Sequence, residues 1–175
     1  ESLKVVALFA GIFGYVWLVL VIWPATGSNA TWGAWLGSIL LTLSATLSYV
    51  LAERSLRGAS SLLIAGTMIA IACAMLGYQV PDLAYLFAVP VVFASVLFGP
   101  LSTAVTAIVA LFLITYIGIS RLGLVFLSAY VFLPFAITSL TTVASWLSQR
   151  SLYTALTWAW NGYERARQNE QAARE

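Results

Sequence analysis

Residues 60–78 read SSLLIAGTMIAIACAMLGY, a run of apolar and small residues without one charged side chain. The run lies inside a longer stretch, residues 58–149, in which Asp82 and Arg121 are the only charged residues. About 20 consecutive apolar residues are enough for a helix to cross a membrane. A stretch this long with two charges is therefore typical of a polytopic membrane protein, not of a water-soluble domain.

The composition of the whole chain agrees with this interpretation. Hydrophobic residues make up 62% of the 175 residues and charged residues 8%, whereas roughly a quarter of a soluble domain is charged. At ~20 residues per span, with short loops, the length allows about six spans. The net charge is +2 and no basic cluster is present, so the sequence does not predict a nucleic-acid partner.

We predict an all-α fold, with a six-helix membrane domain over residues 1–149. Turn-forming residues such as Pro24, Pro81 and Gly99 separate the apolar runs. The predicted spans cover about residues 3–23, 32–52, 60–78, 83–98, 101–119 and 124–149. The bilayer is the first partner that this fold implies.

The charge pattern reverses after the sixth predicted span. Residues 150–175 contain no proline and many charges, so we expect the sixth helix to continue into the cytoplasm. Basic residues in short loops mark the cytoplasmic side of a membrane protein. They cluster on one predicted side, which carries Lys4, Arg54, Arg57, Arg150, Arg165, Arg167 and Arg174, against Arg121 on the other. We therefore predict a multi-pass inner-membrane protein with both termini cytoplasmic.

The tail carries a weak heptad pattern. Positions that alternate at spacings of four and three predict a coiled-coil seam. The residues of this seam are Leu152, Leu156, Ala159, Tyr163 and Ala166. A homodimer through the tail is one interpretation, and an amphipathic helix on a surface is the other.

Several kinds of chemistry are excluded by what the sequence lacks. The chain has no histidine and one cysteine, Cys73, so histidine-ligated metal sites, disulfides within the chain and His-dependent catalysis are impossible. No Asp, Glu, Lys or Arg lies well inside a predicted span, and such residues mark proton and ion pathways. We therefore predict no enzyme activity and no cofactor for this chain.

Two sets of residues are candidates for packing or binding. Small residues at four-residue spacing let helices approach closely, either within the bundle or between copies; they are Gly33, Gly37, Gly66, Ala70, Ala74 and Gly77. Prolines inside spans four and six can kink a helix and open a pocket or hinge. Pro90, Phe93, Tyr130 and Pro134 could then bind a small apolar ligand, although bundle packing is the alternative interpretation.

Two stretches resemble a known family. Residues 92–102 (VFASVLFGPLS), leading into 104–110 (AVTAIVA), and the tail 152–167 (LYTALTWAWNGYERAR) are similar to the polytopic sensor regions of bacterial sensor histidine kinases and to the signalling helix that follows them. The resemblance covers about residues 83–175. It implies a two-component input module whose last helix passes a packing change to a kinase core.

Our leading hypothesis is therefore a membrane sensor of a signal-transduction receptor. The chain begins at Glu1 and stops within a charged helical stretch, so we expect it to be a portion of a longer protein. Two other classes fit the same composition: an accessory or scaffold subunit of a larger membrane complex, and a permease for a neutral or lipid-like substrate. The absence of an internal repeat weakens the permease hypothesis.

Overall fold

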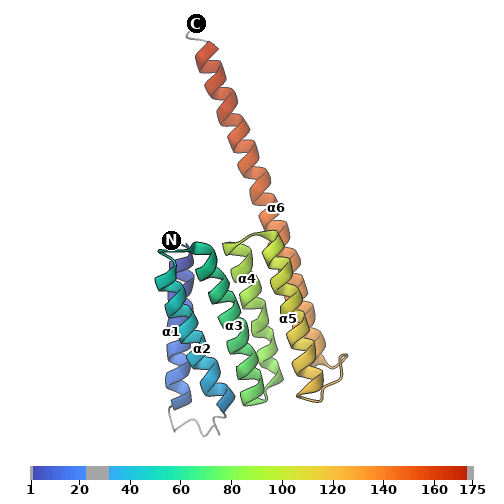
Figure 1. Cartoon of the computed structure of the whole chain (residues 1–175). Helices are drawn as coiled ribbons and strands as arrows, with labels where there is room; N and C mark the ends of the chain where they lie inside the picture. Colours follow the sequence, from blue (N-terminus) through green and yellow to red (C-terminus); the bar gives the residue numbers. More distant parts are fainter. Residues whose placement is uncertain (1, 23–31, 173–175) are drawn as a thin grey trace.

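The computed structural model describes residues 2–22 and 32–172, and every regular element in this part of the chain is a helix. Figure 1 shows helices packed side by side, with one of them projecting far beyond the bundle. The elements in chain order are α1 (Ser2–Ile22), α2 (Trp32–Leu51), α3 (Leu56–Tyr78), the 3₁₀ helix η2 (Pro81–Phe87), α4 (Ala88–Leu97), α5 (Pro100–Ser120) and α6 (Ala129–Ala172). We call the end where α6 leaves the bundle the tail end, and the opposite end the far end.

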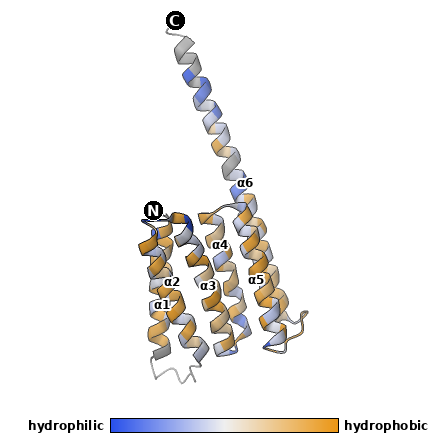
Figure 2. Cartoon of the chain, in the orientation of Figure 1, coloured by the Kyte–Doolittle hydropathy of each residue, from blue (hydrophilic) through white to orange (hydrophobic). Residues whose placement is uncertain are grey.

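Five helices among the described residues, α1, α2, α3, α5 and α6, are long and apolar enough to cross a membrane. Figure 2 shows apolar residues over the bundle and polar residues along the projecting part of α6. Large apolar side chains also point outward, and Phe9 is 68% and Ile108 67% exposed. An exposed apolar surface of this kind is unfavourable in water. The fold therefore supports the class of protein that the composition predicts.

The predicted fourth span, residues 83–98, is not one α-helix. It is η2, a 3₁₀ helix of seven residues, followed by α4 with ten residues. Pro90 is the third residue of α4, in the first turn, where its missing N–H costs least. Because a 3₁₀ helix rises further per residue than an α-helix, the combined length of η2 and α4 is about 29 Å. This is close to the ~30 Å hydrocarbon core of a bilayer.

Two helices begin at residues other than the predicted starts of their spans. Helix α3 begins at Leu56, not at residue 60, because the Ser55 hydroxyl caps it by accepting a hydrogen bond from the Gly58 N–H (3.3 Å). Helix α6 begins at Ala129, not at residue 124. The chain leaves α5 through Gly123, whose φ of +64° is favourable only for glycine.

The helices form two groups that meet at α3. Helix α2 packs between α1 and α3, while α6 packs against α5, α4 and η2. One buried cluster joins α3 to the second group at the far end; it contains Met68, Ile71, Met75, Ala84, Phe87, Val91, Ala107, Ala110, Ile114, Ile117 and Val131. A second cluster joins α1, α2 and α3 near the tail end; it contains Leu3, Ala7, Ala10, Ala45, Ala52, Ala59 and Leu63. Between α1 and α4, packing is sparse.

Candidate functional site: a side groove and the exit of α6

A groove of about 570 Å³ lies where α1 and α4 fail to close over α3. We call it the side groove. Its lining comprises Phe9, Ala10, Phe13 and Trp17 of α1, Leu41 of α2, Thr67, Ala70, Ile71, Ala74 and Tyr78 of α3, Leu83 and Leu86 of η2, and Val89 and Phe93 of α4. The exposed rings of Phe9 and Phe13 lie on one side, and Leu86 and Val89, each more than a third exposed, lie on the other. The groove therefore opens sideways, toward the medium that surrounds the bundle.

The few polar atoms in the lining already have partners. The Trp17 indole N–H donates to the Tyr78 hydroxyl (3.1 Å), which ties α1 to the far end of α3. The Thr67 hydroxyl donates to the Leu63 carbonyl (2.7 Å) within its own helix. No charged residue lines the groove. The site is therefore suited to hydrocarbon and offers no counter-charge to an ionic ligand.

The side groove begins at the far end and extends over more than half of the bundle's depth. On α3 it runs from Thr67 to Tyr78, which at 1.5 Å per residue is about 16 Å. Tyr78 ends α3 at the far end, and Thr67 lies near its middle. A bilayer's hydrocarbon core is ~30 Å thick, so on α3 the groove is about as deep as one leaflet, and on α4 it reaches further, to Phe93.

The structure separates the four residues that we predicted as a pocket or hinge. Phe93 lines the side groove. Pro90 and Pro134 are fully buried in the neighbouring helices α4 and α6, and Tyr130 is half exposed near the start of α6. Among these four, only Phe93 contributes to this groove.

Sequence reasoning missed the contribution of α1. Phe9, Phe13 and Trp17 follow one another at four-residue spacing, which places three aromatic rings on one helix face. That stripe was visible in the sequence. Its partner across the groove was not, because the approach of α1 to α4 depends on the whole bundle.

The small residues of α3 lie on the face that packs against α2, which borders the groove and shares Ala70 and Ala74 with its lining. A Cβ added to Gly33 would lie 2.7 Å from both the Cys73 carbonyl oxygen and the Gly77 Cα. A Cβ on Gly37 would lie 2.9 Å from the Ala70 carbonyl oxygen, and a Cβ on Gly66 would collide with Ser44. Ala70 and Ala74 are buried beside them. These residues therefore bring two helix backbones of the same chain together.

A polar contact links α4 to α6 where α6 leaves the bundle. The Gln149 side-chain N–H donates to the Ser95 carbonyl oxygen. The last carbonyls of an α-helix have no partner within the helix, so Gln149 caps the end of α4 from a different element. The amide oxygen of the same Gln149 side chain is buried without a partner among the described residues. The contact is thus directional and depends on the relative position of the two helices.

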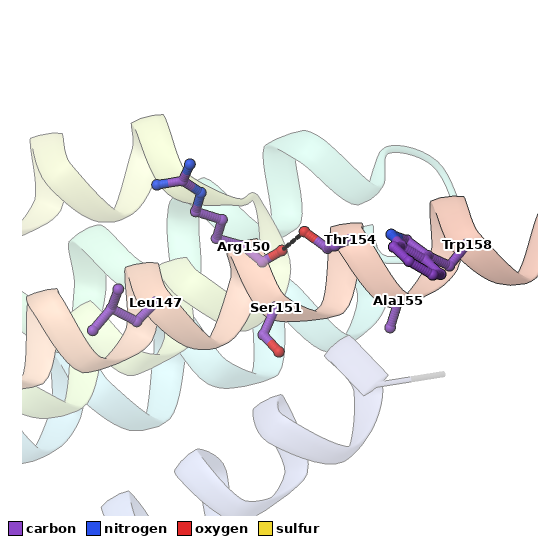
Figure 3. Close-up of a pocket in the computed structure, with 6 residues that line it drawn as sticks. All are labelled: Leu147, Arg150, Ser151, Thr154, Ala155 and Trp158. Atoms are coloured by element: carbon purple, nitrogen blue, oxygen red, sulfur yellow. Dashed lines mark hydrogen bonds between the residues drawn. The ribbon is translucent and has the colours of Figure 1, made fainter.

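Beyond this contact, one face of α6 carries a shallow hollow, lined by Leu147, Arg150, Ser151, Thr154, Ala155 and Trp158. Figure 3 shows Ser151 and Ala155 projecting from one side of the helix and Arg150 from the other, with the Thr154 hydroxyl bonded to the Arg150 carbonyl (2.9 Å). The Arg150 guanidinium also lies 5.8 Å from the centre of the Trp146 ring. This arrangement suits a membrane boundary, where aromatic and basic residues gather.

The predicted seam follows a different face of α6. Leu156 and Tyr163 are each 65% exposed, and Ala159 is exposed as well. The side chains of Leu152 and Ala166 lie outside the described residues. At 100° per residue, the seam is turned by more than 90° from the hollow of Figure 3. The two faces could therefore serve two different contacts.

No group of His, Cys, Asp or Glu within residues 2–22 and 32–172 could hold a metal ion. No family model, curated protein or solved structure matches the chain.

Proposed function

We propose that this chain is the membrane input module of a signalling receptor, which relays a rearrangement of its bundle through α6 to a cytoplasmic output domain. The resemblance to sensor histidine kinases favours a kinase as that output. The observation that carries the proposal is α6 itself. It is one helix of 44 residues, about 66 Å long, of which roughly half exceeds what a bilayer needs.

The two halves of α6 differ in the way that a relay requires. Within the bundle, Pro134 and Thr138 are fully buried and move with their neighbours. Beyond Arg150 every side chain that the structure describes is exposed, and polar residues become frequent (Figure 2). Because no break separates the halves, a tilt or rotation of the buried half displaces the tail.

The charge distribution supports a cytoplasmic tail. Lys4, Arg54, Arg57 and Arg150 lie at the tail end of the bundle, and Arg121 follows α5 at the far end. The positive-inside rule then orients the tail end toward the cytoplasm of a bacterial cell. Six crossings follow if η2 and α4 together span the bilayer.

Gln149 offers a route from the side groove to the tail. Phe93 lines the groove, and the Ser95 carbonyl that Gln149 caps lies two residues further along α4. A ligand that shifts α4 would alter this contact at the point where α6 leaves the bundle. A ligand shifts the equilibrium between two bundle states only if it binds one of them more tightly. Because α4 is a wall of the groove, two positions of α4 would bind the ligand with different affinities.

The reading frame downstream of Glu175 tests the output domain. We expect the helix to continue and to reach a soluble domain with a phosphoacceptor histidine and an ATP site. A stop codon directly after Glu175 would contradict the proposal.

Disulfide cross-linking in native membranes tests the dimeric tail. In a Cys73→Ala background, single cysteines at Leu156, Ala159 and Tyr163 lie on the seam, whereas cysteines at Thr154 and Asn161 lie on the opposite face. We expect the seam positions to give a covalent dimer in several-fold higher yield. Equal yields on both faces, or monomer throughout, would count against relay through a coiled coil.

A further inference from the structure

We propose that the side groove holds one acyl chain of a phospholipid from the leaflet at the far end. The inference rests on the proposed function only for the membrane placement, and it names the class of ligand that the input module would take. It follows from the polarity, depth and rim of the groove.

Polarity excludes ligands that need a charged or hydrogen-bonding partner inside the groove. The Thr67 hydroxyl and the Trp17 indole N–H donate within the chain, the other lining residues apart from Tyr78 are apolar, and almost no polar surface faces the groove. A polar group buried in the groove would lose its hydrogen bonds to water without gaining new ones. A hydrocarbon chain meets no such cost.

Depth selects a chain that enters from one leaflet. The groove begins at the far end, beside Tyr78 and Leu83. On α3 it stops near the middle of the bundle, at Thr67, and on α4 it continues to Phe93, four residues before that helix ends. An acyl chain that starts at the far-end headgroups would follow the same path and end at the same depth. The sideways opening between α1 and α4 lets the chain enter directly from the bilayer.

The rim argues against a helix of a second copy as the occupant. Helices associate in bilayers through small residues that allow close backbone approach. The rim instead presents Phe9, Phe13, Leu86 and Val89, and the glycines Gly33, Gly37 and Gly66 are already in use between α2 and α3. A flexible chain fits between bulky side chains where a helix backbone does not.

Photolabelling tests the site in the reconstituted chain. The probe is a phosphatidylcholine with a diazirine on one acyl chain, in phosphatidylcholine vesicles, and mass spectrometry locates the labelled residues. We expect labelling to concentrate on the groove-lining parts of α1, α3 and α4. The outward face of α5, with Ile108 and Phe112 exposed, reports ordinary contact with surrounding lipid.

Two valines on α4 provide a matched pair of variants. Val89 lines the groove and is 38% exposed, whereas Val92 is 40% exposed and lies outside it. Val89→Trp fills the groove, so labelling of α1 and α3 should fall about tenfold, as for a loss of about 1.4 kcal/mol in binding. Val92→Trp should leave the labelling unchanged. If Val89→Trp does not fold, Leu86→Trp fills the same groove from η2.

Several results would overturn the proposal. Labelling as strong on α5 as in the groove, or no loss of labelling in Val89→Trp, would show that the groove holds no particular acyl chain. Displacement of the label by excess free palmitate would identify a free fatty acid as the ligand. A disulfide between copies that joins Phe13→Cys to Phe93→Cys would place a second copy in the groove. If the groove of the parent chain is not labelled while the seam cysteines still cross-link, the lipid site alone is overturned. If the groove is labelled but the seam cysteines do not cross-link, the relay through a dimeric tail is overturned and the lipid site stands.

Discussion

Two neighbouring faces of α3 are packed in contrasting ways. On the α2 side, glycines bring the backbones so close that a Cβ on Gly33 would lie 2.7 Å from main-chain atoms of α3. On the neighbouring face, which shares Ala70 and Ala74, α1 and α4 leave a groove of about 570 Å³. Closely packed interiors deform little, while an open apolar wall can adjust to a ligand. One helix thus joins a fixed unit to an adaptable one, and the predictions below test that contrast.

The largest effect is expected on the closed side. Gly33→Ala forces the α2 and α3 backbones apart, because both neighbouring atoms belong to the main chain. The free energy of unfolding should fall by about 1–3 kcal/mol, as in other overpacked cores. Unfolding in detergent micelles by titration with a denaturing detergent measures the change.

Gly162→Ala is the matched control for this substitution. A Cβ at Gly162 would meet nothing within 4 Å, and alanine favours a helix interior by about 0.5–1 kcal/mol over glycine. The tail should therefore become slightly more helical. If Gly33→Ala is as harmless as Gly162→Ala, α2 and α3 are not a closely packed unit.

A smaller effect is expected at the other wall of the groove, where α4 meets α6. Gln149→Leu removes the donor that caps the Ser95 carbonyl, at a cost of about 0.5–1.5 kcal/mol for a typical hydrogen bond. The loss should appear in the same unfolding titration, and the tail should become less sensitive to a filled groove. Ser148→Leu, at an exposed neighbour, is the control and should change neither property.

The hydrogen bond at the far end of the groove should contribute less. Tyr78→Phe leaves the Trp17 indole N–H without its acceptor. Side-chain hydrogen bonds between membrane helices contribute about 0.6 kcal/mol on average, so the unfolding free energy should drop by about that much. Tyr116→Phe, half exposed on α5, should have no effect. A loss above about 2 kcal/mol would mean that α1 is fixed more firmly than an open groove allows.

The smallest effect is expected outside the packed region, at the tail end. The Lys4 ammonium lies 3.0 Å from the Glu53 carboxylate, and the two side chains are 40% and 71% exposed. Glu53→Gln should lower the unfolding free energy by less than about 1 kcal/mol, since exposed ion pairs are screened. The difference from the parent chain should vanish in high salt. A difference that persists there would show that Glu53 acts through something other than charge.

Much of this fold follows from local sequence signals. Apolar runs and turn residues locate α1, α2 and α5 to within one or two residues. Pro90 alone does not predict the 3₁₀ start of the fourth segment, because α6 continues as one helix past Pro134. The early start of α3 depends on the Ser55 cap, a polar residue within what reads as a charged loop.

The candidate site was less accessible from sequence. Phe93 was identified because aromatic residues near a proline suggest a pocket, but the groove also needs α1, far away in the chain. Gln149 resembles an ordinary boundary residue, and its role depends on where α4 ends. Contacts of this kind are set by the arrangement of the bundle, which residue spacing does not encode.

The central claim is that the state of the groove reaches the tail through α6. A spin label at Tyr163→Cys in the Cys73→Ala background reports the distance between tails in vesicles by pulsed electron paramagnetic resonance. We predict that Val89→Trp, which fills the groove, shifts the distribution of distances between tails. Val92→Trp should give the same distribution as the parent chain. Identical distributions for all three proteins would contradict the claim.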